Sequence, residues 1–147
     1  MKKLAIVLLL VIAGCRRQVV VSTAPGVNTP GGASARDAVQ RFMAAAKAQD
    51  LQAFSNVWGS TAGPARTNMD KDELEQRQII LLCYLKHDSY RVLSEAPAAN
   101  GERVLTLENK YQDLTRTANF FATRGPENRW YVREFDPESL RAICARR

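Results

Sequence analysis

The stretch from residue 90 to residue 135 reads YRVLSEAPAANGERVLTLENKYQDLTRTANFFATRGPENRWYVREF, and its pattern decides the fold. Apolar and polar residues alternate over 90–96, 102–111, 114–124 and 129–135, which is the two-residue period of β-strands. Turn-forming sequences separate the segments, namely NG at 100–101, QD at 112–113 and GPEN at 125–128. We therefore predict four consecutive antiparallel strands joined by short turns.

Two helices are predicted near the start of the mature chain. Ser34, followed three residues later by Asp37, forms a start like a capping box, and apolar residues then recur at helical spacing to about Gln49. Asp50 can cap a second, shorter helix that Gly59 can terminate. A loop follows these helices.

A third helix is predicted over residues 71–85, with Asp70 as its cap, although the β-branched residues of the run IILL at 79–82 could instead begin a strand. A last short helix, opened by a proline at its first position, should run through Cys144. The predicted class is therefore α+β, with N-terminal helices packed on a curved antiparallel four-strand sheet and a short C-terminal helix.

The beginning of the chain has the features of a secretion signal. Lys2 and Lys3 precede an apolar run of about eleven residues, which is too short to span a bilayer. The run ends in IAGC at 12–15, which resembles the lipobox of bacterial lipoproteins. The resemblance implies cleavage after Gly14 and attachment of diacylglycerol to the Cys15 thiol, with further acylation (for example by palmitate) of the new amine. An ordinary signal peptide with an incidental cysteine is the alternative.

This interpretation divides the chain into a signal peptide (1–14), a lipidated cysteine with a flexible tether (15–33) and a single domain (34–147). Two or more acyl chains anchor a protein stably in a membrane. In a host with two membranes, Arg16 does not resemble the aspartate that retains enterobacterial lipoproteins in the inner membrane. We therefore expect a lipid-anchored envelope protein, in the outer membrane and facing the periplasm.

Charge and motifs exclude several classes of function. Loss of Lys2 and Lys3 with the signal lowers the formal charge from +6 to +4, and the basic residues are dispersed, so no nucleic-acid partner is expected. The sequence shows no metal-ligand spacing, phosphate-binding loop or nucleophile elbow, so no metal or cofactor is expected.

Two short segments suggest a fold family. The run AKAQDLQAF at 46–54, a helix leading into an Asp-initiated second helix, and WYV at 130–132 resemble the opening and closing segments of the nuclear-transport-factor-two-like (cystatin-like, SnoaL-like) superfamily. The resemblance covers residues 33 to about 135. It implies a cone-shaped fold with a pocket between sheet and helices, which relatives use as isomerases, dehydratases, binding modules or dimer platforms. Fold alone does not assign a function.

Polar residues on the predicted inner strands are the candidate ligand-binding groups. Alternation places Asn109 and Tyr111 on the same face as leucines 105 and 107, and Arg116 on the matching face of the next strand. If these faces line a pocket, the three polar side chains could orient a ligand, and Arg116 could favour an anionic one. The alternative is ordinary core packing with polar ends in solvent.

His87 is the sole histidine, at the predicted helix-to-strand junction, and is the candidate general acid or base. A surface or satisfied polar role is the alternative for it. Trp58, Trp130 and Tyr131 could offer stacking surfaces but fit core positions better.

Cys83 and Cys144 remain after lipidation consumes Cys15, and an even pair in an oxidising compartment can form a disulfide between the third and last helices. Two buried free thiols are the alternative.

Three functions are compatible with the sequence. The first is a non-enzymatic lipoprotein that binds a small apolar or amphipathic ligand, or an envelope protein, near the membrane. The second is an isomerase- or dehydratase-like enzyme that uses His87 or a pocket carboxylate. The third is a structural role in which the exposed sheet face forms a homodimer.

Overall fold

A computed structural model describes residues 29–146. The predicted signal peptide, Cys15 and the predicted tether as far as residue 28 lie outside the described residues. Within residues 29–146, no helix is long and apolar enough to cross a membrane.

The three predicted N-terminal helices are present and begin at the predicted caps. Helix α1 spans Ala35–Ala48, α2 spans Leu51–Val57 and α4 spans Lys71–Tyr84. The Ser34 hydroxyl accepts the backbone N–H of Asp37, while the Asp37 carboxylate accepts the N–H of Ala33. Asp50 and Asp70 cap α2 and α4 in the same way. The run at 79–82 is helical, so the alternative of a strand there is wrong.

The loop predicted between α2 and α4 contains short elements that no periodic pattern indicated. Strands β1 (Gly59–Ser60) and β2 (Gly63–Pro64) form a minimal hairpin, and α3 (Ala65–Asn68) follows. A side chain on Gly59 would approach the carbonyl oxygen of Gly63 to 2.3 Å, so only glycine fits this close pairing.

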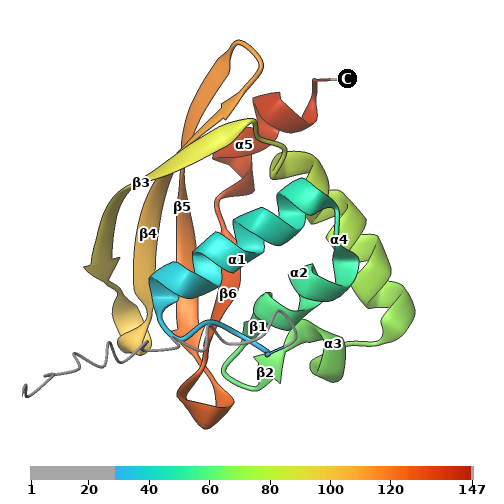
Figure 1. The fold of residues 1–147 in the computed structure, drawn as a ribbon, viewed down its shortest axis with the longest axis vertical. Coiled ribbons are helices and arrows are strands. Elements are labelled where there is room, and N and C mark those ends of the chain that lie inside the picture. The colour runs from blue at the N-terminus through green and yellow to red at the C-terminus, as the bar shows by residue number, and fades with distance from the viewer. Residues whose placement is uncertain (1–28, 147) are drawn as a thin grey trace, which may run out of the picture.

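The four predicted strands form one antiparallel sheet in chain order. They are β3 (Ser89–Pro97), β4 (Arg103–Tyr111), β5 (Leu114–Arg124) and β6 (Trp130–Phe135). All the longer helices lie on one side of this sheet, and α5 (Pro137–Cys144) packs near its upper end (Figure 1). The predicted α+β class and meander topology are confirmed.

The sheet is not strongly curled, in contrast to the curvature that the sequence suggested (Figure 1). The central pair keeps an unbroken register from Arg103 opposite Ala122 to Tyr111 opposite Leu114. Register shifts occur in the flanking pairs, at 92–94 and at 121–122. Because bulges are what bend a strand, the uninterrupted central pair leaves the sheet comparatively flat.

Aromatic side chains fill the space between the helices and the sheet. Phe42 of α1 lies 4.4 Å from Phe54 of α2 and 6.4 Å from Phe120 of β5, measured between ring centroids. Phe120 stacks on Phe135 at 5.5 Å. Around them lie the buried aliphatic residues Val39, Met43, Leu105, Leu107, Val132, Leu140 and Ile143. This packing is a continuous hydrophobic core.

The predicted aromatic core residues lie largely where expected. Trp130 is 8% exposed and Tyr131 is 2% exposed, while Trp58 is half-buried and packs against the core.

Residues 29–33, which the sequence analysis assigned to the tether, belong to the folded domain. Gly32 forms an isolated antiparallel bridge with Trp130, so the incoming chain is bonded to the start of β6. The Arg129 guanidinium donates to the carbonyl groups of Pro30 and Gly31. These contacts place the start of the described chain beside the β5–β6 loop.

The outer face of the sheet is polar. It carries the Arg91–Glu108 ion pair, at 2.8 Å, and a hydrogen bond from the Thr106 hydroxyl to Asn119. Further threonines at 115 and 117 continue this face. Its chemistry is that of a solvated surface.

Candidate functional site

A polar row crosses the inner face of the sheet near its α5 end. Tyr90 of β3 is the register partner of Asn109 in β4, and Asn109 is the partner of Arg116 in β5. Directly opposite residues in an antiparallel pair have Cβ atoms about 5 Å apart on the same face. The row therefore brings together two of the predicted ligand-binding residues, Asn109 and Arg116, and adds Tyr90.

Asn109 is the unusual member of this row. Its side chain is 2% exposed, and neither its amide nitrogen nor its amide oxygen has a hydrogen-bond partner within the described chain. An unpaired polar group costs about 1–3 kcal/mol when buried. The next row towards the core consists of Val92, Leu107 and Ala118, so apolar side chains surround the amide on that side.

Partly exposed groups border Asn109 on the side away from the core. Tyr111, the third predicted ligand-binding residue, pairs with Leu114, and both are partly buried against the core edge. The Arg116 guanidinium donates to the carbonyl oxygen of Thr115 at 2.8 Å and forms no ion pair with any carboxylate of residues 29–146. The border therefore combines two apolar surfaces with a cation that has no acidic partner among residues 29–146.

His87 lies next to this row. Its ring contacts the Tyr90 ring edge-to-face, with centroids 5.4 Å apart, and the residue is 7% exposed. The Nδ1 atom is 2.8 Å from the carbonyl oxygen of Leu85, so in the neutral ring Nδ1–H donates and Nε2 keeps its lone pair. The predicted acid/base candidate is thus buried beside Tyr90.

Burial lowers the pKa of His87 below its ordinary value of 6.5, and the nearby Lys47 ammonium lowers the pKa further. The hydrogen bond with Leu85 and the charge of Asp88 act in the opposite direction and only partly offset the burial. Burial also raises the pKa of Tyr90, so its hydroxyl stays protonated. At neutral pH this corner therefore holds a neutral imidazole and a neutral phenol.

The lowered pKa of His87 predicts a loss of stability in mild acid. The unfolded chain takes up a proton near pH 6.5 and the folded chain only at lower pH, so stability is complete above about pH 6.5 and falls as the pH decreases from there. Urea unfolding at pH 7.5 and pH 5 measures the difference. We expect His87→Gln to show a smaller fall than the wild type, and equal falls would contradict the assignment.

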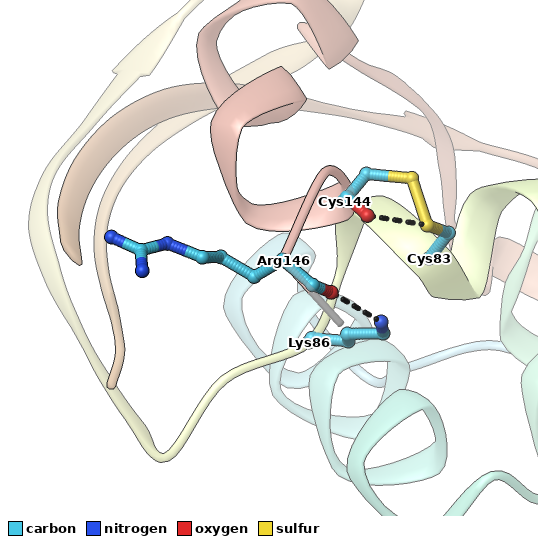
Figure 2. Close-up of a disulfide and its surroundings, with 4 residues drawn as sticks. All are labelled: Cys83, Lys86, Cys144 and Arg146. Carbon is cyan, nitrogen blue, oxygen red and sulfur yellow. Dashed lines mark hydrogen bonds between the residues drawn. A yellow bond between two sulfur atoms is a disulfide. The ribbon is translucent and has the colours of Figure 1, made fainter. Parts of the chain in front are cut away.

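A disulfide holds α5 over this end of the sheet. Cys83 near the end of α4 is bonded to Cys144 at the end of α5, with Cα atoms 4.8 Å apart (Figure 2). Beside it, the Lys86 ammonium donates to the carbonyl oxygen of Arg146 at 3.2 Å. The Arg146 side chain reaches Asp113 in the β4–β5 turn. These contacts connect α4, α5 and the hairpin tip that borders the polar row.

Surface hollows occur elsewhere on the helical layer. A groove of about 350 Å³ lies between α1 and α2 and is lined mainly by alanines 44, 45, 48 and 53. Two others flank α4. These hollows are not lined by the residues of the polar row, and phenylalanines fill the space between the helices and the sheet.

Sequence reasoning found Asn109, Tyr111 and Arg116 from the alternation of their strands, but it did not include Tyr90. Tyr90 lies two residues before Val92, and residues two apart on a strand share a face. This spacing could have placed the Tyr90 ring on the inner face of the sheet. The proximity of His87 to Tyr90 had no such signal, because His87 precedes the strand.

Within residues 29–146, no cluster of three or more potential metal-binding His, Cys, Asp or Glu side chains occurs. Comparisons with models of known protein families, with curated proteins and with solved structures found no match to this chain.

Proposed function

We propose that this chain is a lipid-anchored envelope protein whose domain binds a small amphipathic molecule with an anionic group. The buried, unpaired amide of Asn109 is the observation that carries the proposal. A ligand group that both accepts and donates hydrogen bonds would satisfy the amide, while Arg116 would pair with the anionic group. The apolar part of the ligand would lie against Tyr90, Tyr111 and Leu114.

The cone-shaped, cystatin-like fold is part of the same proposal. Support comes from the helices on one face of a four-strand meander and from the position of the polar row at one end of that face. In such a fold the open end of the inner face is the natural binding position. The flatness of the sheet and its filled interior limit the ligand to a small one.

Binding of dodecanoate, a simple amphipathic anion, tests the proposed site. We expect saturable binding by the wild type, followed by isothermal titration calorimetry. Replacing Arg116 with glutamine should weaken it by about tenfold to a hundredfold, because a hydrogen bond to a charged group contributes about 1.5–3 kcal/mol. Arg141→Gln, which changes an exposed arginine on α5, should bind like the wild type.

Asn109→Leu separates a binding role from a packing role. Removal of an unpaired buried amide should leave the free energy of unfolding unchanged or raise it by about 1 kcal/mol, while binding is lost. Absence of saturable dodecanoate binding to the wild type, or equal affinity in Arg116→Gln, would reject the proposed ligand class. A strongly destabilised Asn109→Leu variant would instead indicate that the amide has a structural role.

Substitution of Cys15 tests the membrane anchor. If Cys15 carries the lipid, Cys15→Ala should abolish incorporation of labelled palmitate and block maturation of the precursor. Measurement of radiolabel and of chain mass in the membrane fraction decides the result. A Cys15→Ala chain that is processed and released normally would refute the lipoprotein assignment, and Cys83→Ala is the matched control that should still incorporate the label.

An isomerase- or dehydratase-like enzyme is the second candidate, and the burial of neutral His87 against Tyr90 favours it. Nε2 of a neutral imidazole can remove a proton next to a carbonyl group. Such an activity should exchange solvent deuterium into a small oxo acid such as 4-oxopentanoate, as followed by NMR in D₂O. Exchange should disappear in His87→Gln, and a wild type that catalyses no exchange would count against this candidate.

A further inference from the structure

The outer face of α4 exposes two large apolar side chains. Ile79 and Ile80 are each 59% exposed, and α4 lies at the edge of the helical layer away from the sheet (Figure 1). A hollow of about 350 Å³ on one side is lined by Gln49, Leu51, Ile79, Leu82, Cys83 and Lys86. A second hollow, of about 250 Å³, is lined by Trp58, Arg77, Ile80 and Leu81. Such a surface costs free energy while it remains in water.

Charges are arranged symmetrically about Ile79. Asp72 lies seven residues before it and Lys86 seven residues after it. Seven residues make about two helical turns, so Asp72 lies on the same side of α4 as Ile79. Lys86 lies just beyond the end of α4 and lines the same hollow as Ile79. Glu75 is also exposed before Ile79, and Arg77 is paired with Glu73 at 2.6 Å, so this side of α4 runs from acidic through apolar to basic.

We propose that this face binds the same face of a second copy of the chain, with the two α4 helices nearly antiparallel. A two-fold axis at Ile79 would place each Ile79 against its counterpart, and Asp72 of one copy opposite Lys86 of the other. The charge pair occurs twice, once at each end. The acidic end of one copy meets the basic end of the other only if the two helices run in opposite directions. The face is therefore complementary to itself only in the antiparallel arrangement.

The remaining groups of the face fit this arrangement. The Lys86 ammonium gives one hydrogen bond to the Arg146 carbonyl, which leaves two donors for an acidic partner (Figure 2). Each hollow beside α4 accepts an isoleucine from the other copy. A crossing angle near 20°, one of the common classes of helix packing, keeps Asp72 and Lys86 within reach of their partners. The outer face of the sheet, by comparison, is polar.

Sedimentation of the processed full chain, extracted in a mild detergent, tests this interface. We expect a dimer that Ile79→Asp converts to a folded monomer, with the circular dichroism spectrum of the wild type. Leu93→Asp is the matched control, because Leu93 is also an exposed large apolar residue, at 46%, but lies on β3. A monomeric wild type, or a dimer that Leu93→Asp disrupts and Ile79→Asp does not, would overturn the proposal.

Charge reversal tests the orientation of the two copies. Asp72→Lys and Lys86→Asp should each weaken dimerisation by about tenfold or more, since each change places two like-charge pairs in the symmetric interface. The double variant should restore the wild-type dissociation constant. Glu138→Lys, which reverses an acidic residue in the first turn of α5, should have no effect. Failure of the double variant to regain affinity would exclude the antiparallel pairing.

Discussion

Replacing both Cys83 and Cys144 with serine is expected to lower the free energy of unfolding by about 4 kcal/mol. The disulfide closes a loop of 61 residues, and the chain-entropy model attributes its effect to restriction of the unfolded chain. For a domain of this size the thermal midpoint should fall by about 10–20 °C. Calorimetry of the wild type and of the double serine variant measures the change.

Reductant provides the control for this experiment. It should destabilise the wild type and leave the double serine variant unaffected. Intact mass should rise on reduction by the mass of two hydrogen atoms. If reductant changes neither the mass nor the midpoint of the wild type, the two cysteines are free thiols, which is the alternative that the sequence left open.

Replacing Phe120 with alanine is expected to cost about 3–5 kcal/mol, because it removes a fully buried ring from the centre of the core. The ring stacks on Phe135 and lies edge-on to Phe42, so its loss affects β5, β6 and α1 together. Denaturant unfolding measures the change in free energy. The variant should have a lower midpoint than any surface substitution on β5.

Phe121 provides a control one position away. It is partly exposed on the opposite face of β5, so Phe121→Ala should cost about 1 kcal/mol. A one-residue shift in register would exchange the two residues between core and solvent. Equal losses for the two variants, or a larger loss for Phe121→Ala, would therefore show that the assigned register is wrong.

Local sequence patterns determined most of the architecture. Ser34, Asp50 and Asp70 define the starts of three helices because each side chain accepts hydrogen bonds from backbone groups two or three residues away. The four strands follow from alternation and the turns between them from residues that tolerate positive φ, as Asn100 does. Alternation also placed Asn109, Tyr111 and Arg116 on one inner face.

Only the tertiary structure decided how the site is assembled. Tyr90 and Arg116 lie opposite Asn109 on the two neighbouring strands, and within residues 29–146 the Asn109 amide has no hydrogen-bond partner. The joining of Cys83 to Cys144 depends on how α4 and α5 pack against each other. Ile79 and Ile80 belong to the most apolar run of the described helices, yet they face solvent because Gln78, Leu82 and Leu85 occupy the buried side of α4.

The physical reason for this division is the range of the interactions involved. Caps, turns and alternation are contacts between residues close in sequence, so the sequence alone shows them. Other properties depend on segments that are tens of residues apart in the sequence. They are whether a buried amide finds a partner, whether two distant cysteines bond and whether an apolar face stays exposed. Those properties are fixed only when helices and sheet pack together and divide the chain into core and surface.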